Sequence, residues 1–504
     1  MSAEQPVPAA TATVAAAPSD RDAAGHGASS RWLVLVIVCM AQFMVVLDAT
    51  VVNVALPSIQ RGLHFSQANL QWVVNAYTLV FGGFLLLGGR AADLLGRKRL
   101  FLVGVLVFSG ASMLNGLAQS SGMLVAGRAL QGLGGAIVSP AALAIITTTF
   151  PDSAERTKAL GVWSAIAAGG AAFGLLLGGV LTDLLSWQWV FFVNLPVGVA
   201  SFAAALRLVP ESRAELEHRS FDLGGAITVT GGLLVLVYAI VEAKTYGWGS
   251  ARIVGLGSLG VALLVAFAAI ESRSRMPLMR LSIFRLRSLA VADGALLLVA
   301  SAMFSMFFFA SLYVQDVQGY SPLRAGLAFL PVSAGIMIGA GAAQQLIRRL
   351  GVRGVSVLGL ALATAGMAWL VRLPVHGSYL GDLLAGLLPL AIGMGLVFVP
   401  ITLLATSGVK HEDAGLASGL FNTAQQVGGA LGLAILSTLA ADHTSALLRG
   451  AGHASVAGAE VAGFHVAFLG GTVMLALGAL FIGVLLRRRH VLHVDVNAPL
   501  TVAA

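Results

Sequence analysis

The stretch LDATVVNVALP, residues 47–57, places a carboxylate, Asp48, near the outer end of the first long apolar segment of the chain. A charged side chain at bilayer depth costs about 2.5–3.5 kcal/mol on insertion scales, and such groups face a protein interior or a water-filled cavity. We therefore expect this segment to belong to a bundle of membrane helices in which the charge of Asp48 is either offset by another group or used in transport.

The composition of the whole chain agrees with a membrane bundle. Of its 504 residues, 58% are hydrophobic and 10% are charged, and the mean hydropathy is +0.90. These values leave too few polar side chains to cover a soluble protein, whereas 61 glycines suit the close packing of membrane helices. The single cysteine, Cys39, excludes an intrachain disulfide and a CxxC-type metal site. We expect no metal and no cofactor.

Fourteen apolar segments are each long enough to cross about 30 Å of hydrocarbon at about 1.5 Å per residue. They cover residues 32–54, 71–89, 100–118, 123–148, 159–182, 189–208, 223–241, 253–270, 289–313, 325–347, 354–372, 382–407, 414–440 and 465–486. The expected fold class is therefore an all-α polytopic membrane protein with fourteen transmembrane helices.

The basic residues predict the orientation of these helices. An even number of spans puts both termini on one side, and the loops and termini of that side hold 23 of the 30 lysines and arginines. Six lie on the other side and one, Arg128, lies within a span. The positive-inside rule then places both termini in the cytoplasm. This distribution explains the net charge of +8 without a nucleic-acid partner.

The longest loops on the basic side follow the sixth and eighth spans and predict how the chain is divided. The expected parts are a disordered tail at 1–31, a six-helix half at 32–208, linkers with two extra helices at 209–288, a six-helix half at 289–486 and a tail at 487–504. The fifth and thirteenth spans have small residues at intervals of four, as symmetry-related helices of two repeats would. The alternative is that glycine is simply common in membrane helices.

A charged loop, GGRAADLLGRKR at 88–99, follows the second span. Its glycines permit a tight turn. A basic anchor at the cytoplasmic surface would explain Lys98 and Arg99 but would gain nothing from the acid, Asp93.

This loop resembles the G-x-x-x-D-x-x-G-R-x-R motif that follows span two in the major facilitator superfamily. The matching residues are Gly89, Asp93, Gly96, Arg97 and Arg99. The resemblance implies a cytoplasmic gate, in which the acid engages a helix N-terminus and basic groups of the other half and releases them during alternating access. The equivalent loop after the tenth span, AAQQLIRRLGVRG at 342–354, keeps Gly351 but has no acid.

Other stretches resemble the fourteen-span drug:proton antiporter family of that superfamily. The opening stretch is similar to its first-span motif, and GRALQGLGGA at 127–136 is similar to its motif around a buried arginine, here Arg128. WQWVFFVNLPVG at 187–198, VQGYSP at 317–322 and GLASGLFNTAQQVGGALG at 415–432 are also similar to the family. The resemblance implies export of amphipathic, often cationic, drugs in exchange for protons.

The fifth span, with GAAFGLLLGG at 170–179, is similar to the antiporter motif of this family. It includes Gly170, Gly174, Gly178 and Gly179. Leu175 stands where the family has a proline, which keeps proton symport open as a further alternative.

Helix geometry brings Asp48 and Arg128 to one depth. The first span runs outward and the fourth runs inward, and both residues lie roughly 8–10 Å below the outer surface at ~1.5 Å per residue. Two interpretations are open: a proton-coupling pair, in which Arg128 senses the charge of Asp48, or a fixed ion pair that joins two helices. Gln131, one turn after Arg128, is expected to orient it.

Other polar side chains in the spans are candidates for the substrate cavity. Asn53 points away from Asp48, and the thirteenth span carries a polar stripe of Ser418, Asn422, Gln425 and Gln426. The stripe is either a cavity wall or a set of interhelical hydrogen-bonding groups. Asp293, near the cytoplasmic edge of the ninth span, is either a second proton or cation site or a solvated carboxylate.

The sequence also argues against two other classes of protein. No lysine follows a glycine, so there is no P-loop of an ATP-driven pump, and there is no HExxH motif of a metalloprotease. We expect a transporter rather than an enzyme: a monomeric, proton-coupled exporter in the plasma membrane, whose partners are small molecules, protons and the lipid bilayer. The main alternative is an exporter of one endogenous metabolite.

Overall fold

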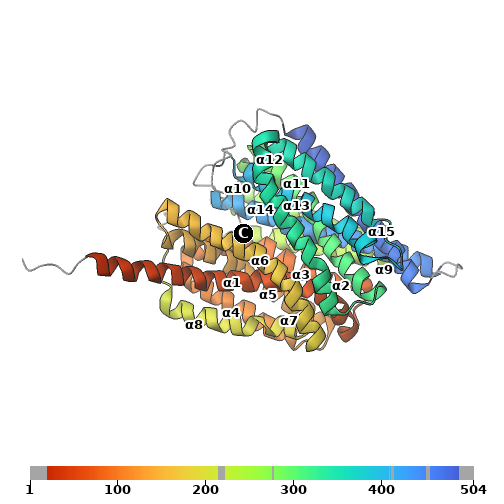
Figure 1. The fold of residues 1–504 in the computed structure, drawn as a ribbon, viewed down its shortest axis with the longest axis horizontal. Helices are drawn as coiled ribbons and strands as arrows, with labels where there is room; N and C mark the ends of the chain where they lie inside the picture. The colour runs from red at the N-terminus through yellow and green to blue at the C-terminus, as the bar shows by residue number, and fades with distance from the viewer. Residues whose placement is uncertain are drawn as a thin grey trace, which may run out of the picture.

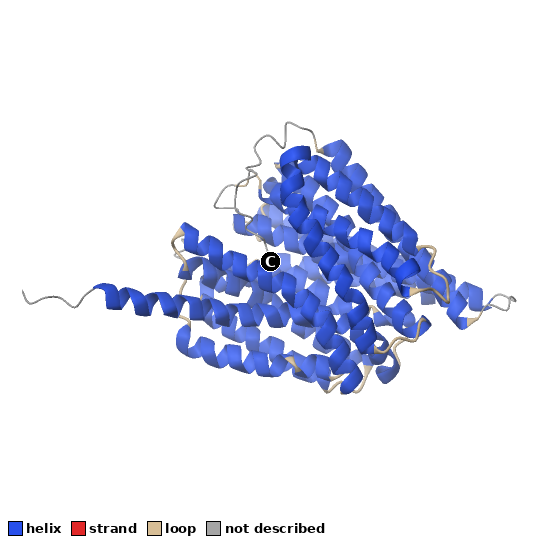
Figure 2. Cartoon of the chain, viewed as in Figure 1, coloured by secondary structure: helices blue, strands red, loops and turns tan. Residues whose placement is uncertain are grey.

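The computed structural model describes residues 20–213, 222–274, 277–407, 409, 414–449 and 455–486, and every regular element within them is helical. Figures 1 and 2 show these helices in two bundles that lie at an angle to each other. The predicted tails at 1–19 and 487–504 lie outside the described residues, as does part of the linker at 214–221.

The first bundle is formed by the N-terminal helices. They are α1 (Asp20–Leu63), α2 (Gln67–Leu70), α3 (Trp72–Leu95), α4 (Arg97–Gly116), α5 (Ser121–Thr149), α6 (Ser153–Leu184), α7 (Trp189–Phe192) and α8 (Asn194–Leu208). Because α1 begins at Asp20, residues 20–31 are helical, and the prediction that they form a disordered tail is wrong. This segment contains no proline that would break a helix before the apolar part of α1.

An inserted hairpin and the second bundle follow. The hairpin is α9 (Leu223–Tyr246) and α10 (Ala251–Arg273). The second bundle contains η1 (Leu281–Arg285), α11 (Arg287–Leu312), η2 (Tyr313–Val317), α12 (Pro322–Leu370), η3 (Tyr379–Leu384), α13 (Ala385–Thr406), α14 (Ala414–Arg449) and α15 (Val456–Leu485).

The predicted fourteen helices are confirmed, with two differences in how they appear. Twelve helices of the described residues are long and apolar enough to cross a membrane. One of them, α12, has 49 residues and holds the tenth and eleventh spans, which Gly351 separates by a kink at φ 71° and ψ 166°. The other difference is α6, whose apolar part, Ala172–Leu184, is shorter than the rest. When the two arms of α12 are counted separately and α6 is included, the twelve helices become the fourteen that the sequence predicts.

Helices α6 and α14 occupy corresponding positions in the two bundles. Helix α6 packs on α1 of its own bundle and on α12 of the other, and α14 packs on α11 of its own bundle and on α3 of the other. Glycines make both approaches close: Gly178 of α6 lies against the backbone of Val51, and Gly428 of α14 lies against the backbone of Leu297. This exchange of partners is the pattern that two structural repeats would produce.

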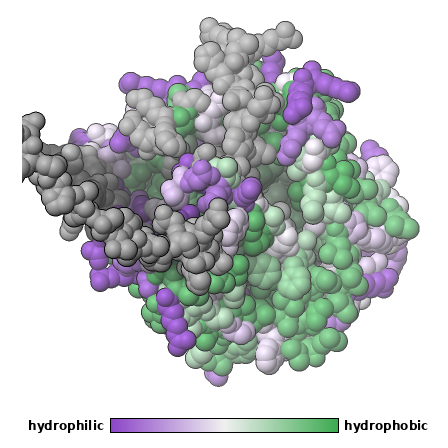
Figure 3. Space-filling view, turned by 60° about the vertical axis from the view of Figure 1, so that its left-hand side comes forward, coloured by the Kyte–Doolittle hydropathy of each residue, from purple (hydrophilic) through white to green (hydrophobic). Residues whose placement is uncertain are grey.

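The inserted hairpin lies beside the contact between α3 and α14. Helix α9 packs on both, with Thr230 against Gly83 of α3 and Thr438 of α14 donating a hydrogen bond to the Ile240 carbonyl at 3.4 Å. Helix α10 packs on α9, but the apolar part of α10 is only 11% buried. The exposed side chains of α10 include Leu259, which is the kind of residue that lipid covers. Figure 3 shows that hydrophobic residues cover much of one side of the molecule.

The two bundles meet at one end and separate at the other. We call the end with the α3–α4 turn, which holds Arg97 and Arg99, the basic end, and the opposite end, with Arg61 and α2, the far end. Figure 1 shows the bundles meeting where α2 and α7 lie and diverging towards the start of α1.

Candidate functional site

Asp48 and Arg128 form an ion pair in the interior of the first bundle. The Arg128 Nη1 atom lies 2.5 Å from Asp48 Oδ2, and the two side chains are 0% and 2% exposed. The other carboxylate oxygen, Oδ1, accepts hydrogen bonds from Gln131 Nε2 at 2.7 Å and from Asn194 Nδ2 at 3.0 Å. The two residues that the depth argument placed at one level are therefore in contact, and Gln131 touches both of them.

The arginine is fixed by contacts on its other sides. Its Nε donates to the Val73 carbonyl at 2.9 Å, and its Nη1 also donates to Gln131 Oε1 at 2.8 Å. The Tyr77 ring lies with its centroid 4.3 Å from the guanidinium carbon, a cation–π distance. These groups hold the guanidinium in one place between α3 and α5.

Two residues of α4 extend the network. Asn115 Nδ2 donates to Gln131 Oε1 at 2.7 Å, and Asn194 Nδ2 also donates to Ser112 Oγ at 3.0 Å. All of these polar side chains are buried. A buried ion pair survives desolvation only when further hydrogen bonds satisfy its remaining atoms, and this network supplies them from α1, α4, α5 and α8.

The sequence prediction did not include Asn194, Ser112, Asn115 or Tyr77. Of these four residues, only Asn194 could have been suggested by the sequence, because it lies within the stretch at 187–198 that resembles the antiporter family. The network is compatible with both interpretations of the pair. A fixed ion pair needs no access, whereas proton coupling requires that water reach a carboxylate that is 0% exposed in this conformation.

The predicted cytoplasmic gate has local partners in this structure. Asp93 accepts hydrogen bonds from Arg97 at 2.8 and 3.1 Å, and Arg99 Nε lies 3.7 Å from Glu211 Oε2 in the segment after α8. Gly96 makes the turn at φ 113°, and Gly89 packs beside Pro140. Residues 410–413, just before α14, lie outside the described residues. A contact between Asp93 and the other bundle therefore stays a prediction.

The polar stripe of α14 divides between two environments. Gln426 packs against Gly82 of α3, next to Thr423, whose hydroxyl donates to the Gly82 carbonyl at 3.2 Å. Ser418, Asn422 and Gln425 are half-buried. The Asn422 amide donates within its own helix to the Ser418 carbonyl at 3.2 Å, as Asn53 does to Ala49 at 3.2 Å.

Asp293 is buried rather than solvated. Its side chain is 6% exposed, and neither carboxylate oxygen accepts a hydrogen bond from the described residues. The solvated alternative is therefore wrong for this conformation.

The far end of the molecule is closed by contacts between α1 and the end of α11. Pro57 has no N–H group, so it leaves the Asn53 carbonyl without a donor inside α1. Ser311 Oγ of the second bundle donates to that carbonyl at 2.7 Å, and Gln315 Nε2 donates to the Val54 carbonyl at 2.9 Å. We call these two bonds the far-end seal.

Replacing Ser311 with alanine should weaken the far-end seal. The partly buried Asn53 carbonyl would lose its donor, at a cost of about 1 kcal/mol, while in an opened form water could reach it. We expect a cysteine introduced at Val54 to react with a water-soluble maleimide roughly fivefold faster in the Ser311→Ala protein. Ser356→Ala is a matched control, because among the described residues the Ser356 hydroxyl donates its hydrogen bond to Val352 of its own helix. Equal rates in the two proteins would contradict the role of the seal.

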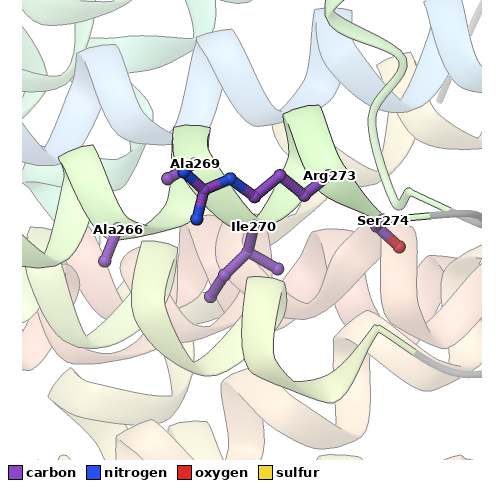
Figure 4. A pocket seen from close by; sticks show the side chains of 5 residues that line it. All are labelled: Ala266, Ala269, Ile270, Arg273 and Ser274. Carbon is purple, nitrogen blue, oxygen red and sulfur yellow. The ribbon is translucent and has the colours of Figure 1, made fainter.

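A surface hollow lies apart from these polar groups. It has a volume of about 510 Å³ and is formed by one side of α10 near the basic end. Its lining residues are Ala266, Ala269, Ile270, Arg273 and Ser274 (Figure 4).

Among the described residues, no three acidic, histidine or cysteine side chains are arranged to hold a metal ion.

Comparison with known proteins shows the family. Residues 38–433 match the family model described as Major Facilitator Superfamily. The chain belongs to the major facilitator superfamily. It is a membrane transporter with multiple spans, and its two bundles correspond to the fold of that family.

Relatives of this major facilitator protein are named for antibiotics. A puromycin resistance protein of Streptomyces alboniger is 43% identical over 467 residues, covering 91% of this chain and 92% of the relative. The cephamycin export protein of Amycolatopsis lactamdurans is 41% identical over 414 residues, covering 82% and 85%.

A solved structure shares the fold. It is the crystal structure of a bacterial homologue of the human lysosomal transporter Spinster, in an inward-facing and unoccupied conformation. The TM-score is 0.65 at 17% identity, over 92% of this chain and 98% of that chain.

Proposed function

We propose that this major facilitator protein exports amphipathic drugs or toxic small molecules across the plasma membrane in exchange for protons. The observation that carries the proposal is the 43% identity, over 91% of the chain, with a puromycin resistance protein. The positive-inside rule places the basic end in the cytoplasm. The sealed far end and the diverging basic end then suit a form that accepts substrate from the cytoplasm.

The Asp48–Arg128 network would couple protons to this movement. A proton on Asp48 removes the charge that Arg128, Gln131 and Asn194 bind, so their hydrogen bonds must rearrange. Because these residues come from several helices, such a rearrangement changes how the helices pack. The loop with Asp93 and Arg97 would close the basic end in the opposite state, and the polar residues of α14 would contribute to the substrate cavity.

Two alternatives differ in substrate or direction. The cephamycin export protein is named for one compound, which favours the alternative of a dedicated exporter of one endogenous metabolite. Leu175, in place of the proline of the antiporter motif, keeps proton symport as a third possibility.

Inverted membrane vesicles with an acid interior would test the proposal. If drugs enter in exchange for protons, adding puromycin or another substrate should collapse the pH gradient within minutes. The Asp48→Asn protein should show no substrate-induced collapse, whereas the control Asp442→Asn, on the outer part of α14, should behave like the wild type. Collapse in both variants would keep antiport and remove Asp48 as the coupling site, and no collapse in wild type would contradict drug antiport.

A further inference from the structure

Asp293 lies on the face of α11 that points towards the first bundle. Asp293 and Ser311 are 18 residues apart, which is about five turns of an α-helix, so they share one face. Ser311 marks the direction of that face because it donates a hydrogen bond to the Asn53 carbonyl of α1. Asp293 therefore lies nearer the basic end on the same face, where the two bundles diverge.

The register between α11 and α14 places Asp293 beside polar residues. Leu297 packs against Gly428 and Ser301 packs against Gly432, so the two helices run parallel with a constant offset. One turn before Leu297, the same offset puts Asp293 level with Ala424. The amide side chains of Asn422 and Gln425 leave α14 at this level.

The amides face the region between the bundles. Helix α14 contacts α11 on the side marked by Gly428 and α3 on the side marked by Gly419 and Gln426. Asn422 and Gln425 lie on the arc between these two sides, separated from each other by about 60°. Both side chains are half-buried, so part of each side chain stays accessible between α11 and α3.

Within the described part of the chain, the carboxylate of Asp293 has no cation beside it. Its two oxygens accept no hydrogen bond from the described residues, and none of the ion pairs among those residues includes it. The nearest basic residue on its own helix, Arg287, is exposed at the basic end. A buried carboxylate without a positive partner is costly, and a cation supplied from outside removes that cost.

We propose that Asp293, with Asn422 and Gln425, forms a subsite for the cationic group of transported compounds. The carboxylate neutralises an ammonium or phosphonium charge, and the amides offer hydrogen bonds beside it. The subsite rests on the proposed export function and names the chemistry that this function selects. The subsite also divides the roles of two buried acids: Asp48 is already paired with Arg128, whereas Asp293 has no ion-pair partner among the described residues and can bind the substrate.

Binding of tetraphenylphosphonium, a permanent cation, to the purified full-length protein tests this subsite. We expect Asp293→Asn to weaken its affinity at least about tenfold, Asp293→Glu to keep most of it, and Asp442→Asn to leave it unchanged. Affinity for uncharged chloramphenicol should stay within about twofold in every variant. Unchanged tetraphenylphosphonium affinity in Asp293→Asn, equal losses for both compounds, or no binding of the cation by wild type would overturn the proposal.

A second measurement needs no variant to fold. Dicyclohexylcarbodiimide modifies buried carboxyl groups, and tetraphenylphosphonium should protect Asp293 of the wild-type protein from it at least about fivefold more than chloramphenicol does. Equal labelling with and without the cation would overturn the subsite. Both measurements are made without a pH gradient, so they separate the two proposals: vesicles that show no proton exchange would remove the coupling while cation binding at Asp293 stands, and the reverse result would remove only the subsite.

Discussion

An Arg128→Met protein should export nothing and should denature at a clearly lower temperature than the wild type. The substitution leaves Asp48 at 0% exposure without the cation that lies 2.5 Å from its Oδ2 atom. Breaking a buried pair by removing one partner costs about 3–5 kcal/mol, because an uncompensated charge stays in the interior. The Val73 carbonyl also loses the hydrogen bond that Arg128 Nε donates. Thermal denaturation of the purified protein and drug uptake into inverted vesicles would measure the two effects.

The double variant Asp48→Asn/Arg128→Met separates the charge from the contact. With the carboxylate neutralised, Gln131 and Asn194 can still bond to the amide oxygen of residue 48, so we expect the denaturation temperature to recover much of its loss. Export should not recover if Asp48 carries the coupled proton. A double variant that exports drug against a gradient would show that the pair is only structural, and stability losses that simply add would contradict the coupling of the two residues.

Arg61→Met provides the matched control for loss of a basic residue. Arg61 also forms an ion pair, with Asp316 at 3.3 Å, but its side chain is 64% exposed. Exposed ion pairs contribute about 0–1 kcal/mol. We therefore expect the denaturation temperature and export of this variant to stay close to those of the wild type.

The helices and the central ion pair are the parts that could be predicted from sequence. Apolar segments of sufficient length and the distribution of basic residues depend only on the bilayer, which acts on each span separately. Helix rise and span direction placed Asp48 and Arg128 at one depth, and the structure adds that their helices are neighbours and the side chains are in contact. A break at Gly351 was also visible, although the helix continues on both sides of it and appears as one element.

The neutral members of the network could not be predicted in the same way. Serine and asparagine occur throughout membrane helices, and only the packing of α4 and α8 against α1 and α5 shows that Ser112, Asn115 and Asn194 converge. The partner of the Asn53 carbonyl was hidden for a similar reason. Pro57 shows that a carbonyl is freed, but nothing local shows that Ser311, in the other bundle, satisfies it.

The close approach of α6 to α1 at Gly178 predicts a second substitution with a large effect on folding and export. A Cβ atom added at Gly178 would lie 2.7 Å from the carbonyl oxygen of Val51 and 3.1 Å from its Cα. Those atoms belong to the backbone of α1, so a side chain at Gly178 must push the whole helix rather than one rotamer. Helix α1 carries Asp48 three residues before Val51, and a displacement there also disturbs the ion pair with Arg128.

Replacing Gly178 with valine should therefore abolish export and reduce the yield of folded protein severalfold. Overpacking of this kind costs about 1–3 kcal/mol or more. Glycines of the same helix form a graded control: a Cβ at Gly170 would meet side-chain atoms of Phe43 at 3.3 Å, and one at Gly169 would meet nothing within 4 Å. We expect Gly170→Val to be intermediate and Gly169→Val to be close to wild type, measured by size-exclusion yield and by drug uptake into vesicles. If the Gly178→Val and Gly169→Val proteins behave alike, the close approach of α6 to α1 does not set the packing of the first bundle.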